Sequence, residues 1–130
     1  MIKKKVIESI FNSVGKSIWL QKEEEIDLFT AFSGSGPAYF FYLSECLAKI
    51  AIEGGFSKES AYTISKQVLI GAGDLIKKSG LDPVELRENV TSPNGTTEEA
   101  FKVLENKEND FYNILKEAIR RAEQRSIEMS

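Results

Sequence analysis

Apolar residues recur at every third or fourth position along the chain, in runs that glycine or proline interrupts. This spacing places them on one face of an α-helix. The pattern predicts an all-α bundle in one domain, residues 1–130, with a polar turn around 106–109. The expected helices are Ile2–Val14, a short one from about Glu23 to Phe32, and others after Pro37, Ser57, Asp82 and Thr97 and from Phe111.

Local signals mark where several of these helices begin and end. Gly54-Gly55 is expected to end one helix with a C-cap, and Ser57 to cap the next. The segment Asp82–Glu85 supplies an N-cap, an N1 proline and an N3 glutamate in succession. Gly71 and Gly73 lower the helix propensity of their segment, and close approach to another helix would compensate for this.

The helix predicted after Pro37 is apolar on nearly every face. Such a helix is buried, either in a core or between subunits. A chain of 130 residues cannot easily enclose it, so we expect a second copy of the chain to cover part of it. The apolar positions are Phe40, Phe41, Leu43, Leu47, Ala48, Ile50, Ala51 and Ile52.

The composition is that of a soluble globular protein, with 42% hydrophobic and 28% charged residues. A net charge of −3 argues against a non-specific nucleic-acid partner, which requires a basic surface. No apolar run approaches the roughly 18 residues of a transmembrane helix, and Glu8 and Asn12 interrupt any signal-peptide core. We therefore expect a cytoplasmic protein with no membrane partner.

Side chains for acid–base or metal chemistry are scarce. The absence of histidine removes the commonest general base and most zinc sites. Cys46 is the only cysteine, so no internal disulfide or thiolate metal cluster is expected. Lys22–Glu25 is interpreted as a solvated stretch, and no metal site is predicted. Gly34-Ser35-Gly36 is a weak dinucleotide fingerprint, because Tyr39 replaces the third glycine and no βαβ unit surrounds it.

One stretch between predicted helices, Val90–Thr97, cannot be helical. Pro93 lacks a backbone N–H and disfavours the helical region at the residue before it, and Asn94-Gly95 is a turn pair that tolerates positive φ. Thr96 to Glu99 reads T-x-x-E, which predicts a capping box at the next helix. The last amide groups of the loop would then suit an anion at a helix N-terminus. A structural turn whose hydroxyl groups only cap the helix is the alternative.

Two motifs together resemble the C-terminal domain of the pyrroline-5-carboxylate reductase family. Thr30–Tyr39 is similar to the family segment T-A-x-S-G-S-G-P-A-Y, and Val90–Thr97 is similar to its V-T-S-P-G-G-T-T loop. The helix between them, with Gln67 followed by Gly71-Ala72, matches in character and spacing. The likeness extends from about Ile7 to the C-terminus.

The resemblance implies a fold and an activity. The family reduces 1-pyrroline-5-carboxylate to L-proline with NADPH or NADH, the last step of proline biosynthesis. Its C-terminal half is an all-helical domain that forms a homodimer through interlocking long helices, and some members assemble dimers into larger oligomers. The NADP or NAD belongs to an N-terminal Rossmann half, and the active site lies where that half meets the helical domains.

The resemblance also assigns roles to residues of this sequence. Ser92 and the backbone amides of Gly95 and Thr96 would hold the substrate carboxylate. The Thr97 hydroxyl would point at the imine nitrogen as the candidate catalytic group, and Val90 would line the ring pocket. Because the cofactor would supply the hydride and the protein would mainly orient the reactants, a site of this kind does not require a histidine. The residues that would face the nicotinamide are Ser33, Gly34, Ser35 and Gly36.

Two features depart from the family pattern. Asn94 stands where the family usually has glycine; asparagine suits positive φ, but its side chain could crowd the carboxylate. The Rossmann half is absent from this chain, which begins inside what would be the domain junction. We therefore expect neither tight cofactor binding nor reductase activity from this chain alone. The alternative function is a non-enzymatic helical oligomerisation module derived from the same family.

Overall fold

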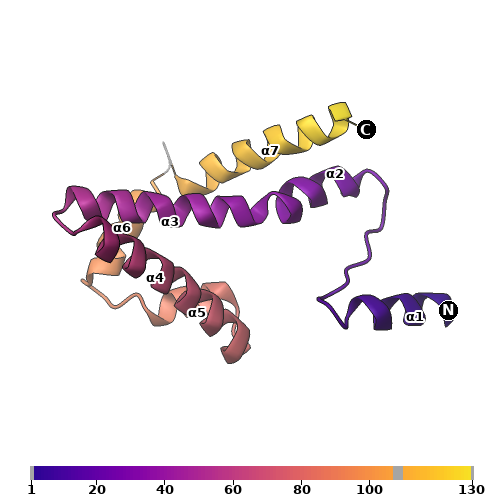
Figure 1. Ribbon diagram of the computed structural model, residues 1–130, viewed down its shortest axis with the longest axis horizontal. Helices are drawn as coiled ribbons and strands as arrows, with labels where there is room; N and C mark the ends of the chain where they lie inside the picture. Colours follow the sequence, from indigo (N-terminus) through magenta and orange to yellow (C-terminus); the bar gives the residue numbers. More distant parts are fainter. Residues whose placement is uncertain (1, 107–109, 130) are drawn as a thin grey trace.

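The computed structural model describes residues 2–106 and 110–129 and is mostly helical (Figure 1). These ranges contain no β-strand, so the predicted all-α class is confirmed. None of their helices is long and apolar enough to cross a membrane, and the predicted polar turn at 106–109 lies mostly outside them. The elements are α1 (Ile2–Phe11), α2 (Glu25–Phe29), the π-helical turn η1 (Thr30–Gly34), α3 (Gly36–Glu53), α4 (Lys58–Ser79), α5 (Pro83–Asn89), α6 (Thr96–Leu104) and α7 (Phe111–Met129).

The most extensive packing within the chain is between α3 and α4, which runs back obliquely beneath α3 (Figure 1). The buried side chains of these two helices are small, since Ala48, Ala61 and Ser65 are at most 3% exposed. Ser44 Oγ donates a hydrogen bond to Ser65 Oγ across the pair, at 3.3 Å. Small residues at a crossing let two helices approach closely, so this pair is the best-packed part of the chain.

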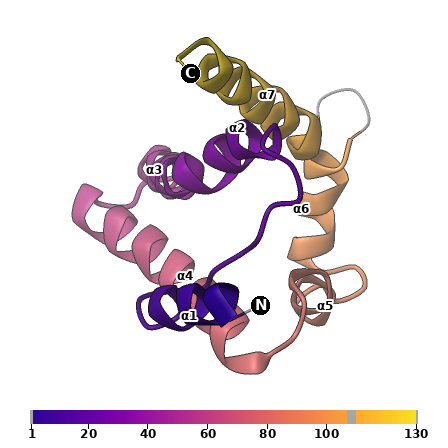
Figure 2. The same ribbon diagram turned by 90° about the vertical axis from the view of Figure 1, so that its right-hand side faces the viewer.

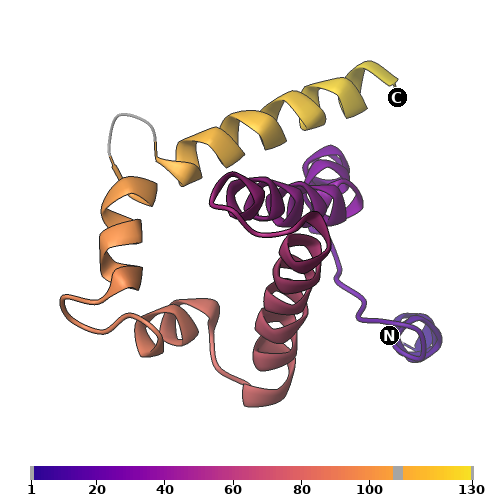
Figure 3. The same cartoon turned by 60° about the vertical axis from the view of Figure 1, so that its left-hand side comes forward.

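A second layer is formed by α7, which lies alongside α2 and η1 (Figures 1 and 3). The path from α2 through η1 into α3 is continuous and helical, with no loop between them. Ala31 of η1 is 1% exposed and is buried between these elements. These helices thus form two layers that share the continuous path from α2 to α3, while α1, α5 and α6 lie outside them.

The predicted caps at the ends of α3 and α4 are confirmed. Ser57 Oγ accepts a hydrogen bond from the Ser60 amide at 3.1 Å and so caps α4. Gly55 and Gly80 follow the two helices with φ values of 99° and 70°, which glycine adopts without steric cost. Asp82 is the N-cap residue of α5, as predicted, but its side chain makes no capping hydrogen bond.

Two predicted helix boundaries are wrong, and side-chain hydrogen bonds explain both. The first helix ends at Phe11, earlier than predicted, because Asn12 Oδ1 accepts hydrogen bonds from the Ser17 amide and hydroxyl groups, each at 2.9 Å. The second begins at Glu25, later than predicted, and its carboxylate accepts a hydrogen bond from the Gln21 amide at 2.8 Å. Side-chain acceptors of this kind compete with helical hydrogen bonds for the backbone.

Helix α1 stands apart from the other helices, beyond the irregular segment 12–24 (Figures 1 and 3). In Figure 2, which is viewed from the side where α1 lies, this helix is drawn in front of the end of α4. Trp19 folds back onto it: its indole Nε1 donates a hydrogen bond to Glu8 Oε1 at 2.7 Å, and Lys4 Nζ lies 4.7 Å from the ring centroid. Ile10 and Phe11 remain more than half exposed. The helix therefore has a local partner in Trp19 and an open apolar face.

One chain encloses little apolar surface. Its accessible surface is 11061 Å², whereas a compact monomer of this mass would expose about 6,900 Å². No large side chain of the described residues is fully buried, and Phe40 and Phe41 of α3 are 58% and 68% exposed. A Cβ atom placed at Gly71 or Gly73 would meet nothing within 4 Å, so the close helix contact predicted there does not occur within the chain.

Candidate functional site

The stretch predicted to be non-helical joins α5 to α6. Asn94 has a φ of 59° and is the one non-glycine residue with positive φ in the described ranges, which confirms the turn expected at Asn94-Gly95. The Gly95 amide donates to the Ser92 carbonyl at 3.0 Å and closes this turn. Before it, Thr91 Oγ1 donates to the Arg87 carbonyl at 2.7 Å. Both ends of the loop are thus fixed by local hydrogen bonds.

The predicted T-x-x-E capping box is wrong by one residue. Gly95, not Thr96, is the N-cap residue of α6, and it has no side chain with which to cap. The carboxylate that reaches back is that of Glu98, whose Oε2 accepts a hydrogen bond from the Asn94 amide at 2.6 Å. Glu99, assigned to this role from the sequence, instead pairs with Lys102.

The Gly95 position explains why the loop has this shape. A Cβ atom there would lie 2.5 Å from Ser92 Oγ and 2.9 Å from the Ser92 carbonyl oxygen, distances that no side chain can occupy. The Ser92 hydroxyl therefore lies directly against the start of α6. The backbone amides of Thr96 and Thr97 donate no hydrogen bond to any described residue. The loop thus brings together one hydroxyl group and two unused amide donors.

Arg87 connects the two helices that flank this loop. Its guanidinium donates a hydrogen bond to the Glu105 carboxylate, from α5 to the end of α6, and lies 5.1 Å from the Phe101 ring centroid. Its carbonyl holds Thr91, as described above. Sequence reasoning missed this residue, because nothing in the spacing shows that Arg87 reaches the far end of α6.

The other predicted site segment, Ser33–Gly36, spans the end of η1 and the start of α3. The Ser35 amide donates to the Thr30 carbonyl at 3.1 Å, five residues back, in the π-helical turn η1. Ser33 Oγ donates to the Phe29 carbonyl at 2.8 Å, and the Tyr39 hydroxyl donates to the Ala31 carbonyl at 2.9 Å. π-Helical turns inside α-helices occur frequently at functional sites.

A single chain does not bring the two segments together. η1 packs against α2, α3 and α7, whereas the loop joins α5 to α6, away from these elements (Figures 2 and 3). Ser92, Gly95, Thr96 and Thr97 form one cluster, with Val90 next to it at the end of α5. Ser33, Gly34, Ser35 and Gly36 form a separate one.

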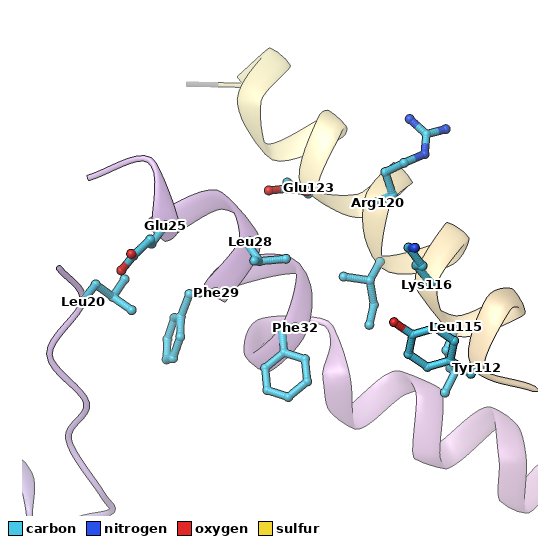
Figure 4. A pocket seen from close by; sticks show the side chains of 11 residues that line it. Leu20, Glu25, Leu28, Phe29, Phe32, Tyr112, Leu115, Lys116, Arg120 and Glu123 are labelled. Carbon is cyan, nitrogen blue, oxygen red and sulfur yellow. The ribbon is translucent and has the colours of Figure 1, made fainter. Parts of the chain in front are cut away.

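A large groove lies elsewhere, between α2–η1 and α7, with a volume of about 780 Å³. Figure 4 shows Leu28 and Phe32 on one side and Tyr112 and Leu115 on the other. Charged groups at its edge include Glu25 and Arg120 of opposite helices, and none of the predicted site residues lines it. It is therefore an apolar groove distinct from both candidate site segments.

Comparison with known proteins assigns the chain to a family. Residues 23–129 match the family described as pyrroline-5-carboxylate reductase dimerisation. The chain is 41% identical to the pyrroline-5-carboxylate reductase of Pseudomonas aeruginosa, over 93% of this chain and 44% of that protein. It is 39% identical to pyrroline-5-carboxylate reductase 1 of Bacillus subtilis, over 98% of this chain and 42% of that protein.

Solved structures agree with this assignment. A pyrroline-5-carboxylate reductase from Coxiella burnetii superposes with a TM-score of 0.87 at 39% identity, over 98% of this chain and 47% of that one. A Plasmodium falciparum pyrroline carboxylate reductase with NADP bound gives 0.77 at 32% identity, over 96% and 47%. The chain thus spans less than half the length of these relatives. It belongs to the pyrroline-5-carboxylate reductase dimerisation family.

Proposed function

We propose that this chain is the substrate-binding and dimerisation part of a cytoplasmic pyrroline-5-carboxylate reductase, which reduces 1-pyrroline-5-carboxylate to L-proline. The observation that carries the proposal is the turn in which Ser92 lies against Gly95 at the start of α6. This turn presents a hydroxyl group and unused amides at a helix N-terminus, where negative charge is favoured. A carboxylate-bearing substrate fits that chemistry.

In this proposal the substrate carboxylate accepts hydrogen bonds from Ser92 Oγ and from the amide of Thr96. The Gly95 amide is already used by the Ser92 carbonyl, so the contribution of Gly95 is its missing side chain. The Thr97 hydroxyl orients the imine nitrogen, and Val90, which is 63% exposed, supplies an apolar wall for the ring. Each group therefore has one role that a substitution can test.

The segment Ser33–Gly36 has features that suit one part of a nicotinamide cofactor. A Cβ atom at Gly36 would meet nothing within 4 Å, so the backbone is open to a flat ring, while the Ser33 hydroxyl is used by Phe29. Nothing in this segment offers a charged group for phosphates. NADP or NAD, when bound, supplies the hydride. We propose that tight binding requires a nucleotide-binding unit; micromolar affinity of this chain alone for NADPH, measured by calorimetry, would contradict this.

We also propose that the chain forms a homodimer. Its accessible surface of 11061 Å² exceeds that of a compact monomer by about 4,000 Å². Two copies together therefore have more surplus surface than the roughly 2,000–5,000 Å² in total that obligate dimers bury. The apolar groove and the exposed side of α3 are the surfaces that a second copy would cover. A dimer could also bring the loop of one chain to η1 of the other. Light scattering should give twice the monomer mass, or a multiple of it if dimers assemble further.

The nucleotide-binding unit also needs a surface to contact, and we propose that α1 provides it. The segment 2–22 lies outside the matched dimerisation range 23–129, yet full-length relatives match over 93% to 98% of this chain. Its apolar face, which includes Val6 and Ile10, is more than half exposed. This segment is therefore available to a domain that the dimerisation family does not include.

Reconstitution tests the proposed function directly. We would combine the chain with the nucleotide-binding half of the Bacillus subtilis relative and follow NADPH oxidation that depends on 1-pyrroline-5-carboxylate. Thr97→Ala should lower kcat by roughly 10²-fold, the lower end of what a positioned proton donor contributes. Thr97→Ser keeps the hydroxyl group and should restore most of the rate. An equal rate in Thr97→Ala would remove Thr97 from its role.

The same experiment separates the alternative function. A non-enzymatic oligomerisation module would dimerise normally but would give no substrate-dependent NADPH oxidation with any nucleotide-binding half. The separation of the two site segments within one chain favours this alternative for the isolated molecule. Retention of an open turn at Ser92–Gly95 favours the reductase.

A further inference from the structure

Asn94 and Gly95 form the only Asn-Gly pair in the chain, and they lie within the proposed carboxylate site. We propose that this pair is a site of spontaneous deamidation, which converts Asn94 to aspartate or isoaspartate. The modification itself follows from the chemistry and position of the pair. Only its effect on substrate binding rests on the proposed function.

The reaction needs no reagent except water. The backbone nitrogen of Gly95, after losing its proton to solvent, attacks the side-chain Cγ of Asn94. A C–N bond forms, the bond from Cγ to the amide nitrogen breaks, and that nitrogen leaves as ammonia after gaining a proton. Water then opens the five-membered imide at either carbonyl and gives aspartate or isoaspartate. The balance is one water consumed and one ammonia released.

The position of the pair favours this attack. Asn94 is exposed and lies outside any helix, and Gly95 has no side chain that shields its nitrogen. Gly95 is also the N-cap residue of α6, where the helix dipole stabilises the negative charge that develops on this nitrogen. By contrast, Asn89 ends α5 before the branched Val90, and Asn113 lies inside α7 before Ile114.

Two hydrogen bonds of the folded loop oppose the attack. The Gly95 amide donates to the Ser92 carbonyl at 3.0 Å, and the Asn94 amide donates to Glu98 Oε2 at 2.6 Å. The first must open before the nitrogen can react. Deamidation of Asn94 should therefore be slower in the folded chain than in urea, although faster than at other asparagines of the folded chain.

The products would damage the proposed site in two ways. Aspartate adds a negative charge beside Glu98 and Glu99, which already occupy the first turn of α6, and so opposes binding of a carboxylate. Isoaspartate adds one methylene to the backbone in a turn where even a Cβ atom at Gly95 would lie 2.5 Å from Ser92 Oγ. Either product would weaken substrate binding, so the protein would lose function with age.

The proposal is tested by incubating the intact chain in mildly alkaline buffer, digesting it and measuring its peptides by mass spectrometry. The peptide with Asn94 should gain the mass of an amide-to-acid exchange several-fold faster than peptides with Asn12, Asn89 or Asn113, and an isoaspartyl methyltransferase should label it. Asn12 is the closest comparison, since Ser13 follows it and its side-chain oxygen is held by Ser17. Asn94→Gly suits the same positive φ and should abolish the signal. A rate at Asn94 no higher than at these other sites would overturn the proposal.

The reconstituted enzyme separates this inference from the proposed function. Aged wild-type protein should lose activity in step with the mass change, while aged Asn94→Gly should keep its starting activity. Full wild-type activity after complete deamidation would overturn the effect on the site. An enzyme that is inactive before ageing would contradict the proposed function and leave the mass result intact.

Discussion

At the scale of single residues, the loop before α6 depends on the absence of a side chain at Gly95. An added Cβ atom would collide with Ser92 Oγ and with the Ser92 carbonyl oxygen. Gly95→Ala should therefore lower the free energy of unfolding by about 1–3 kcal/mol, the usual cost of overpacking. Urea denaturation followed by circular dichroism measures this change.

Two further variants test that explanation. Gly15→Ala places a Cβ atom with nothing within 4 Å and should leave the free energy of unfolding almost unchanged. Adding Ser92→Ala to Gly95→Ala removes the 2.5 Å contact with the hydroxyl but keeps the 2.9 Å contact with the carbonyl oxygen. The double variant should recover only part of the lost stability, and full recovery would show that the backbone contact has no cost.

Glu98 makes the second residue-scale contribution, because its carboxylate reaches back over the turn to the Asn94 amide. Glu98→Gln weakens this acceptor and should cost about 0.5–1 kcal/mol, within the range of helix-capping interactions. Glu99→Gln is the matched control, because Glu99 pairs with Lys102 on the surface and such pairs contribute little. Equal losses in the two variants would contradict a special role for Glu98.

At the scale of elements, hydrophobic spacing predicts the all-helical class, and the residue types at the helix ends predict the main caps, because both depend on neighbouring residues. The spacing could not predict η1, since a π-helical turn of five residues is too short to show a period of its own and is defined by the carbonyl that the Ser35 amide selects. The capping box was misplaced because the left-handed Asn94 makes Gly95 the N-cap residue. The sequence predicts the positive φ of the Asn94-Gly95 turn, but it does not show that this turn starts α6 one residue earlier than the capping box indicates.

Helix α7 carries an acidic group whose titration can be predicted. Glu117 accepts hydrogen bonds from Arg120 Nε at 2.8 Å and from Arg121 Nε at 2.9 Å. These bonds, that of Arg120 first, lower the pKa of Glu117 from 4.5 to about 2. Because this pKa is depressed on folding, the stabilisation is present above pH 4.5 and is lost as the pH falls towards 2.

Carbon-detected NMR of the Glu117 carboxyl group should show titration near pH 2. Replacing Arg120 and Arg121 with glutamine should raise this pKa towards its ordinary value, whereas Arg125→Gln should not change it, because Arg125 pairs with Glu128. The effect on global stability should be small, since the ion pair is exposed. A Glu117 pKa that stays unchanged when both arginines are replaced would contradict Arg120 and Arg121 as the cause of the shift.

At the scale of the whole molecule, a single chain leaves the apolar side of α3 and the groove between α2–η1 and α7 open. The spacing of α3 anticipated this, because a helix apolar on all sides cannot be enclosed by so short a chain. The relation between the two site segments could not be anticipated, since it depends on how copies and domains are arranged in space. The structure shows that one chain holds the Ser92–Thr97 cluster and η1 apart, the first between α5 and α6 and the second between α2 and α3 (Figures 2 and 3).

Phe32 provides the most direct test of the proposed dimer. It is 64% exposed and lines the groove between α2–η1 and α7 (Figure 4). If a second copy fills this groove, Phe32→Asp places a charge in an apolar contact and should weaken association by about 2 kcal/mol, a typical hot-spot value, or roughly 30-fold in Kd. Gln124→Asp on α7 adds the same charge outside the groove and should leave Kd unchanged. Sedimentation equilibrium measures both, and circular dichroism confirms that the helices persist. A charge is unfavourable in this mainly apolar groove only if a second copy covers it. Equal dimerisation by the two variants would therefore mean that the second copy covers α3 and leaves the groove open.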